Sequence, residues 1–276
     1  MARLSTDNGG VIDLHGHQLP GVDDGAADLA VSREAINRMV DQGVVGFSVT
    51  PHVRASKLIS EAMRSAVVAP LDAAWADLTE MCATEYPSLT VRRGAEVMFD
   101  HPLPELLPEW VRLGGTRYVL LEFPSMMIPP RVPEALIPVL RAGYTPVIAH
   151  PERYRNASPD GAEALSWKQV GALLQVNCGS LLGQYGPKVA ERAKRLLTAG
   201  AVDYMAGDYH CRGLYPVREA RGVLERAGGK EHAELLLEVN PARILNDEVM
   251  ADVPPLTMRE GLGKVVEGVR KWFGGM

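Results

Sequence analysis

Residues 11–17 read VIDLHGH, a short apolar run that ends directly in two histidines separated by one glycine. Comparable runs of aliphatic and β-branched residues recur at 11–14, 44–50, 89–94, 118–123, 145–149, 173–177 and 202–206. Runs of this length, bounded by glycine, proline or charge, are typical of buried parallel strands. Amphipathic stretches with a helical period separate them, so the pattern predicts a mixed α/β fold with a parallel sheet and outer helices.

The expected helices occupy residues 29–42, 58–85, 133–142, 166–172, 187–199, 217–227 and 231–239. Asp28 is placed to cap the first of them, and Gly43 to end it. Pro70 should break or restart the second helix, because proline lacks an N–H donor and clashes with the preceding turn. A further helix is expected near residues 258–272, in a peripheral tail.

Composition excludes several classes of protein. The 276 residues carry a net charge of -5 and contain no apolar run long enough to span a membrane. An acidic chain without a basic stripe is not expected to bind nucleic acid. The first ten residues lack the pattern of a secretory signal. Cys82, Cys178 and Cys211 are too few and too widely spaced for a disulfide framework, so we expect a reducing, cytoplasmic location.

Side chains that bind metals stand at the C-terminal ends of nearly all the predicted strands. They are His15, His17, His52, Glu96, Glu122, His150, Asp208 and His210. The C-terminal end of a parallel α/β barrel carries the active site, which is assembled from several strands. An open sheet would not bring seven strand ends together, so the sequence favours a closed or nearly closed barrel.

Imidazole and carboxylate groups suit zinc, manganese or iron, and no cluster of thiolates favours a softer metal. His15 and His17 lie two residues apart, as do Asp208 and His210, so each pair shares one face of a strand. These groups are too many for one ion and suffice for two or three ions bridged by a carboxylate. A single buried histidine is more often an ordinary core residue, but repetition at successive strand ends favours a metal site. His101 is expected in a loop, and His232 is expected on the surface.

The same segments, taken in order, resemble the PHP (polymerase and histidinol phosphatase) superfamily and, within it, the bacterial CpsB/CapC-type tyrosine-protein phosphatases. The resemblance rests on IDLHGH at 12–17, LPGVDDG at 19–25, TPH at 50–52, GAE at 94–96, LEFP at 121–124, PVIAHPER at 146–153, NCGSLLG at 177–183, DYH at 208–210 and NPARIL at 240–245. It implies a distorted (β/α)7 barrel, the TIM-like PHP fold. The chain would then be a single PHP phosphatase domain, 1–276, with a core at about 11–246 and a C-terminal helical tail at 247–276.

The resemblance also implies three divalent metal ions, most often Mn2+, with Fe2+ or Zn2+ as alternatives. His15, His17, Glu96 and Asp208 would hold one ion. Glu96, as a bridge, would hold a second ion with Glu122 and His150. Asp24, His52 and His210 would hold the third. Asp24 is preferred to Asp23 because of its distance after the two histidines.

The implied activity is metal-dependent hydrolysis of phosphotyrosine on a bacterial tyrosine autokinase of capsule or exopolysaccharide biosynthesis. Arg153, three residues after His150, is expected to clamp the phosphate, with Arg212 as a weaker candidate. Asp208 or His210 could also give a proton to the leaving group, although both fit better as metal ligands.

Three other interpretations compete with this one. The chain could be a PHP phosphoesterase of a small monoester such as histidinol phosphate, or a non-catalytic metal-binding module on the same fold. An amidohydrolase would usually need a carbamylated lysine on a middle strand, and no predicted strand here ends in lysine.

Cys211 and Arg218 resemble a cysteine-phosphatase pair, but Pro216 interrupts the intervening loop. Cys211 is therefore expected to be non-catalytic.

Overall fold

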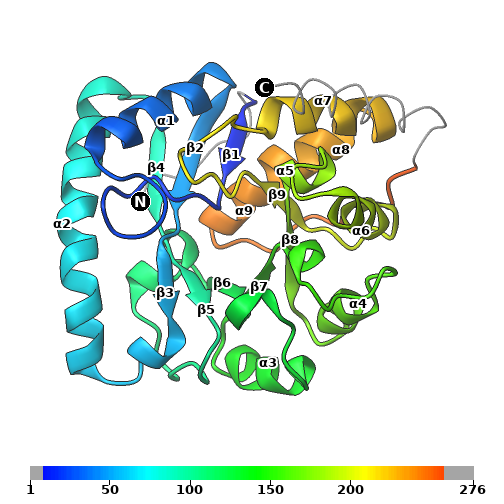
Figure 1. Ribbon diagram of the computed structural model, residues 1–276, viewed down its shortest axis with the longest axis horizontal. Coiled ribbons are helices and arrows are strands. Elements are labelled where there is room, and N and C mark those ends of the chain that lie inside the picture. Colours follow the sequence, from blue (N-terminus) through cyan, green and yellow to red (C-terminus); the bar gives the residue numbers. More distant parts are fainter. Residues whose placement is uncertain (1–8, 258–276) are drawn as a thin grey trace.

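Two parallel sheets form the centre of the protein, shown in Figure 1 as a computed structural model that describes residues 9–257. The smaller sheet has the order β1 (Val11–Asp13), β2 (Val44–Val49), β4 (Thr90–Arg93). The larger sheet has the order β3 (His52–Arg54), β5 (Glu96–Met98), β6 (Tyr118–Glu122), β7 (Thr145–Ala149), β8 (Leu173–Asn177), β9 (Tyr204–Ala206). All the strand pairs in both sheets are parallel, which confirms the predicted mixed α/β class.

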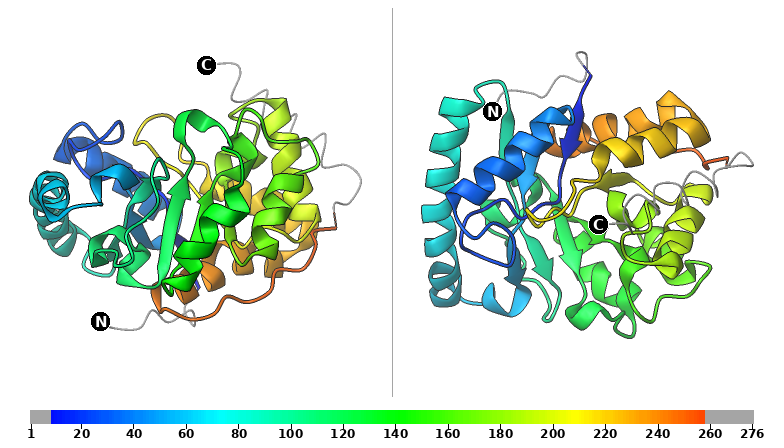
Figure 2. Two further views of the ribbon diagram at one scale, coloured as in Figure 1. Left: turned by 90° about the horizontal axis from the view of Figure 1, so that it is seen from below. Right: turned by 45° about the horizontal axis from the view of Figure 1, so that its top comes forward.

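Helices surround these strands in both views of Figure 2. They are α1 (Leu29–Asp41), α2 (Glu61–Glu85), α3 (Val132–Arg141), α4 (Ala162–Gln169), α5 (Cys178–Leu181), α6 (Pro187–Thr198), α7 (Val217–Gly228), α8 (Lys230–Glu234) and α9 (Asn240–Leu245). A π-helical turn at Leu235–Val239 joins α8 to α9. Short 3-10 turns lie at Ala55–Lys57, Glu109–Val111, Leu113–Gly115, Pro124–Met126 and Pro151–Arg153. Among the described residues, we find no helix with the length and apolar content needed to cross a membrane.

The seven predicted runs all contain strands, but β3 and β5 were not predicted. Each follows a break in the preceding strand, at Thr50–Pro51 and at Gly94–Ala95. Pro51 has no N–H for a ladder, although its carbonyl still accepts a hydrogen bond from the Glu96 N–H at 3.1 Å. The apolar run ends at each break while the backbone remains extended, so hydrophobicity alone does not reveal the continuation.

Backbone hydrogen bonds tie the two sheets together at the C-terminal ends of their strands. Beyond β1 and β9, Gly16 pairs with Tyr209, and the His17 N–H donates to the Tyr209 carbonyl at 3.0 Å. The Asp208 N–H donates to the His15 carbonyl at 2.8 Å. The histidine segment at 15–17 is thus fixed to the last strand of the larger sheet by main-chain bonds rather than by side chains alone.

Local sequence signals explain most of the helix boundaries. The Asp28 carboxylate accepts the Val31 N–H at the start of α1, and Gly43 follows this helix with a φ of +87°. The prediction of a break at Pro70 is wrong, because α2 runs through it with an apolar stripe that includes Leu71 and Leu78 in the core. Residues 247–257 contain no helix, and the helix expected at 258–272 lies outside the described residues.

Candidate metal centre

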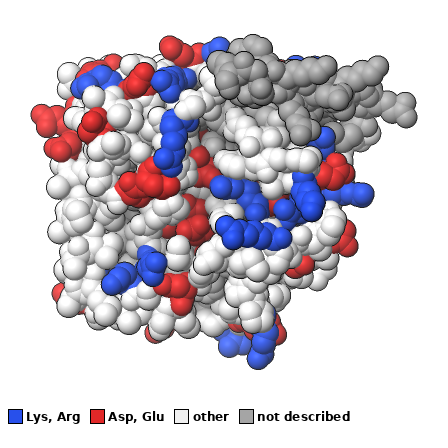
Figure 3. All heavy atoms as spheres, viewed as in Figure 1, with Lys and Arg blue, Asp and Glu red and all other residues white. Residues whose placement is uncertain are grey.

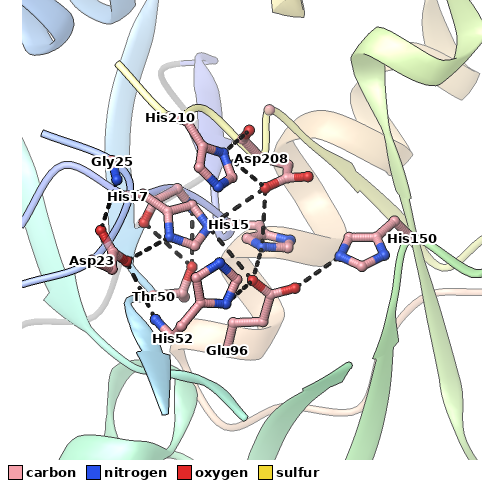
Figure 4. Close-up of polar contacts among 12 residues, drawn as sticks. His15, His17, Asp23, Gly25, Thr50, His52, Glu96, His150, Asp208 and His210 are labelled. Atoms are coloured by element: carbon pink, nitrogen blue, oxygen red, sulfur yellow. Dashed lines mark hydrogen bonds and ion pairs between the residues drawn. The ribbon is translucent and has the colours of Figure 1, made fainter. Parts of the chain in front are cut away.

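The candidate ligands meet at the C-terminal ends of the strands, where Figure 4 shows imidazole and carboxylate groups turned toward one another. Three overlapping groups have their potential ligand atoms within 4.8 Å of each other. They are His15, His17, Glu96 and Asp208; His17, Asp24, His52 and His210; and His52, Glu96 and Glu122. His17, His52 and Glu96 each belong to two groups, so they are placed to link neighbouring ions.

The first group, which we call the inner group, is fully buried. His15 Nε2 lies 3.1 Å from Glu96 Oε2 and 3.4 Å from Asp208 Oδ1. His17 Nε2 lies 3.5 Å from each of the same two oxygens. Two imidazole nitrogens and two carboxylate oxygens thus surround one small volume, which is the arrangement expected of ligands around a cation.

The second group, which we call the outer group, lies nearer to solvent. His52 Nε2 is 3.5 Å and His210 Nε2 is 3.3 Å from Asp24 Oδ1. The His17 ring belongs to this group as well and lies almost parallel to the His210 ring, with centroids 4.0 Å apart. The structure therefore brings Asp24, His52 and His210 together, as the family resemblance implies.

The expected grouping of Glu96, Glu122 and His150 is found only in part. His52 Nδ1 lies 3.2 Å from Glu122 Oε1 and also 3.2 Å from Glu96 Oε2, so His52 joins Glu122. His150 contacts Glu96 at its other oxygen, with a distance of 2.8 Å from Nε2 to Oε1. Glu96 thus connects His150 to the cluster, and the His150 ring also lies beside the His15 ring, with centroids 5.6 Å apart.

Several buried polar atoms in this cluster have no hydrogen-bond partner. They include His15 Nε2, His17 Nε2 and Asp208 Oδ1, which all face the same volume. Buried polar atoms are almost always satisfied, because leaving one unpaired costs about 1–3 kcal/mol. A divalent cation would satisfy all of them at once, so the residues present fit a metal.

The pKa shifts of the inner group also favour the binding of a cation. Burial lowers the pKa of His15, but the carboxylates of Glu96 and Asp208 outweigh burial and raise it to about 9. Burial opposes ionisation of Asp208, yet His15 and His17 hold its pKa well below its usual value. These carboxylates are therefore held as anions that attract positive charge. A metal binding there would displace protons from the imidazoles.

Two amides that were not predicted hold the inner ligands in place. Gln175 Oε1 accepts the His15 Nδ1 proton at 2.8 Å, which leaves His15 Nε2 free to bind a metal. Gln175 Nε2 donates to Asn177 Oδ1, and Asn177 Nδ2 donates to Asp208 Oδ2 at 2.7 Å. Both amides belong to β8, which therefore sets the orientation of one ligand that follows β1 and one that follows β9.

Asp23 orients His17, a role the sequence did not reveal. Its Oδ2 lies 2.7 Å from His17 Nδ1, and its Oδ1 accepts the Gly25 N–H at 2.9 Å. Gly25 is required there, because a Cβ atom would lie 2.1 Å from the His17 carbonyl oxygen. Adjacent aspartates thus have different tasks: Asp23 holds a ligand, and Asp24 faces the outer group.

Unusual backbone conformations direct two of the candidate ligands. His150 and Asp208 have φ values of +34° and +49°, a region that non-glycine residues seldom adopt. Such strain persists at functional sites when the surroundings fix it. The surroundings here include the buried Asp13, which accepts the Gly207 N–H at 3.0 Å and the Tyr215 hydroxyl at 2.7 Å.

A cavity of about 320 Å3 opens beside the cluster. It is lined by Asp24, Arg153, Gln184, Tyr185, Gly207, Asp208, Tyr209, His210, Arg212, Leu214 and Pro216. Arg153 donates to Asp208 Oδ2, and its guanidinium lies 4.2 Å from the centre of the Tyr185 ring. Arg212 is exposed and pairs with Asp24 at 3.1 Å. Both arginines predicted from the sequence therefore line the cavity, and Tyr185 was not predicted.

The remaining candidates do not belong to any of the three groups of potential ligands. Cys211 is not among the residues that line the cavity; its thiol donates to the His17 carbonyl at 3.4 Å, and burial raises its pKa to about 12. His101 contacts the carbonyl of Pro102 in a loop. His232 contacts the carbonyls of Gly228 and Pro254.

Known proteins resemble the chain over nearly all of its described length. The sequence profile described as "Capsular polysaccharide synthesis, CpsB/CapC" matches residues 11–246. Tyrosine-protein phosphatase YwqE of Bacillus subtilis is 31% identical over 250 residues, which cover 89% of this chain and 95% of YwqE. Tyrosine-protein phosphatase CpsB of Streptococcus pneumoniae is 26% identical over 249 residues, covering 87% of this chain and all of CpsB.

A solved structure also resembles this chain. It comes from work on YwqE of Bacillus subtilis and CpsB of Streptococcus pneumoniae, described as unique metal-dependent tyrosine phosphatases. It superposes with a TM-score of 0.75 at 30% identity and covers 90% of this chain and all of its own.

Proposed function

Because the chain belongs to the CpsB/CapC family of capsular polysaccharide synthesis, we propose that it is a metal-dependent protein-tyrosine phosphatase. The observation that supports this most directly is the meeting of three groups of imidazole and carboxylate ligands beside a cavity that contains Arg153. The reaction would be hydrolysis of a phosphoric monoester, with phosphotyrosine as the substrate group.

We propose that the three groups correspond to three divalent ions, with Mn2+ as the preferred metal and Fe2+ or Zn2+ as alternatives. When bound, such ions neutralise the charge of a phosphate ester and lower the pKa of bound water toward about 7. The three groups would supply the ligands His15, His17, Asp24, His52, Glu96, Glu122, Asp208 and His210. His150, which lies 2.8 Å from Glu96 but in none of the three groups, would join them as a ninth ligand. The two sheets would act together as a distorted (β/α)7 barrel that holds these ligands at one end.

Arg153 would bind the phosphate. A guanidinium has five N–H donors, and its contact with Asp208 leaves most of them available. Since planar guanidinium groups bind two phosphate oxygens at once, Arg153 would also fix the orientation of the ester. Arg212 would assist from the exposed side of the cavity.

The walls of the cavity suit an aromatic alcohol. Tyr185 lies on one side over Arg153, and the apolar side chains of Leu214 and Pro216 also line the cavity. A phenol has a pKa near 10, so it departs more easily than an alkanol and needs less help from a proton donor. Asp208 and His210 can therefore serve as metal ligands without a second role as general acid.

The protein substrate would be tyrosine-phosphorylated, and we propose a bacterial tyrosine autokinase of capsule or exopolysaccharide synthesis. We also propose a cytoplasmic location. The three cysteines are free thiols, and two of them are buried, which suits a reducing compartment.

Turnover by chelated and metal-reloaded protein tests the proposal. The protein would be stripped with a chelator and reloaded separately with Mn2+, Fe2+ and Zn2+, with metal content measured by elemental analysis. A phosphotyrosine peptide and histidinol phosphate would be assayed in parallel. We expect turnover of the peptide to disappear with the metal, return on reloading, and exceed that of histidinol phosphate by orders of magnitude. The opposite preference, or metal-loaded protein without phosphatase activity, would overturn the proposal.

Arg153→Lys tests the proposed contact between Arg153 and the phosphate. Loss of a two-pronged, charged contact should lower kcat/KM for the peptide about 10-fold to 100-fold. The metal content should stay that of the unaltered protein, because lysine retains the positive charge beside Asp208.

A further inference from the structure

A second cavity, of about 570 Å3, opens on the same end of the protein as the metal centre. It is lined by Arg155, Ala157, Pro159, Pro187, Lys188, Glu191 and Arg192. These residues come from the segment that follows β7 and from the first turns of α6, which follows β8. We call this cavity the basic groove.

Two of the three basic side chains of the groove have no partner within the part of the protein that the structure describes. Among the described residues, the side chains of Arg155 and Lys188 are exposed and make no ion pair or hydrogen bond. Arg192 is largely buried and donates to the carbonyl oxygens of Tyr154 and Ala157 at 2.5 and 3.3 Å rather than to a carboxylate. The carboxylate of the groove, Glu191, faces Arg195 at 3.8 Å.

The basic groove adjoins the cavity at the metal centre. Arg153 lines the first cavity and Arg155 the second, and they are separated only by the buried Tyr154. Likewise, Tyr185 lines the first and Pro187 the second, with only Gly186 between them. Figure 3 shows blue basic side chains gathered next to red acidic side chains near the middle of this face.

Resting on the proposed function, we propose that the basic groove binds an acidic side chain of the substrate, an aspartate or glutamate close in sequence to the phosphotyrosine. Arg153 and Arg155 are two residues apart, so their Cα atoms lie at most about 7 Å from each other, and their long side chains can widen this span. Because an extended peptide advances about 3.3 Å per residue, the acidic residue would lie roughly two to four positions from the phosphotyrosine. Carboxylates suit the unpaired guanidinium and ammonium groups by charge, and Pro159 and Pro187 offer apolar surface to the peptide.

Paired phosphotyrosine peptides test this directly. Each pair would differ only by aspartate or asparagine at one position, two to four residues before or after the phosphotyrosine. We expect the metal-loaded protein to prefer one aspartate peptide about threefold to tenfold in kcat/KM, mainly through KM, since each exposed charge pair contributes only modestly to affinity. Added salt should reduce the preference.

The double variant Arg155→Gln with Lys188→Gln should remove the preference and leave kcat for the asparagine peptide unchanged. Arg141→Gln with Arg226→Gln is the matched control, because these exposed arginines lie near the C-terminal ends of α3 and α7. The control should keep the full preference.

The outcomes separate the two proposals. Equal turnover of all paired peptides, or a preference that survives the Arg155 and Lys188 substitutions, would overturn the acidic-residue proposal and leave the phosphatase intact. A preference for a second phosphotyrosine that aspartate does not reproduce would also overturn it. Absence of turnover on every phosphotyrosine peptide would overturn the proposed function itself.

Discussion

The inner and outer groups share His17 but are held in very different ways. The Asp208 side chain of the inner group is 2% exposed and is fixed by Asn177 and Arg153. The Asp24 side chain of the outer group is 59% exposed and pairs with Arg212, whose side chain is 68% exposed. The Asp208 carboxylate is therefore ordered before a metal binds, whereas the Asp24 carboxylate would become ordered only on binding the metal.

This difference predicts unequal metal binding. Ligands that are already fixed lose little conformational entropy on binding, whereas an exposed side chain loses more. Buried charges are also screened less by water and salt than exposed charges. We therefore expect an ion in the inner group to be retained and one in the outer group to exchange more readily.

Glu96→Gln should have the largest effect, because Glu96 contacts His15, His17, His52 and His150. Removing the charge should lower kcat/KM about a hundredfold or more, since losing a residue that only orients a metal ligand already costs about 10-fold to 100-fold. Elemental analysis should show the loss of more than one ion per chain. The exposed Glu105→Gln is the control, and a full metal content in Glu96→Gln would contradict a bridging role.

Asn177→Ala tests how the inner group is held. Loss of the hydrogen bond to Asp208 should weaken metal affinity or activity about 10-fold to 100-fold, the usual range for residues that orient a ligand. The Asn177 N–H donates to Glu152 at 3.0 Å, and that bond does not depend on the side chain. The backbone should therefore remain in place.

Metal titration followed by activity distinguishes orientation of a ligand from general destabilisation. Asn37→Ala on α1, which loses the hydrogen bond that Asn37 Oδ1 accepts from the Tyr86 hydroxyl, is the control. An unchanged metal affinity in Asn177→Ala, together with a lowered melting temperature, would show that Asn177 serves stability only.

Asp24→Asn should have a smaller effect. We expect about a tenfold loss of activity at limiting metal that excess metal restores, because a weakened site refills by mass action. Asp23→Asn, one residue earlier, would disturb the orientation of His17 and should not be restored in this way. Identical behaviour of the two neighbours would remove the distinction between a ligand and an orienting residue.

The difference between the groups also explains what the sequence could predict. His15, His17, Glu96 and Asp208 follow apolar runs directly, and parallel strands bring their C-terminal ends together. Asp24 lies in a loop, where spacing carries no such rule, and only the family resemblance identified it. The pairing of Glu122 with His52 rather than with His150 depends on side-chain directions that no sequence pattern encodes.

The residues that orient the ligands were missed for a related reason. Gln175 and Asn177 interrupt a buried strand with neutral amides, which sequence patterns do not distinguish from ordinary polar strand residues. Their role depends on contacts with residues more than 30 positions away.

The strands β3 and β5 and the intact helix at Pro70 were missed because local rules were overridden by packing.

Cys211→Ser should have the smallest effect and separates this chemistry from that of cysteine phosphatases. The thiol donates to the His17 carbonyl, outside the cavity, and a serine hydroxyl can make the same contact. A nucleophilic cysteine would need to face the phosphate within a loop of backbone donors, but Pro216 offers none. We expect kcat/KM within about twofold of the unaltered protein, because serine retains the hydrogen bond to the His17 carbonyl and removes no candidate metal ligand. Loss of all activity with a full complement of metal would instead make Cys211 the nucleophile and reduce the histidine cluster to a supporting role.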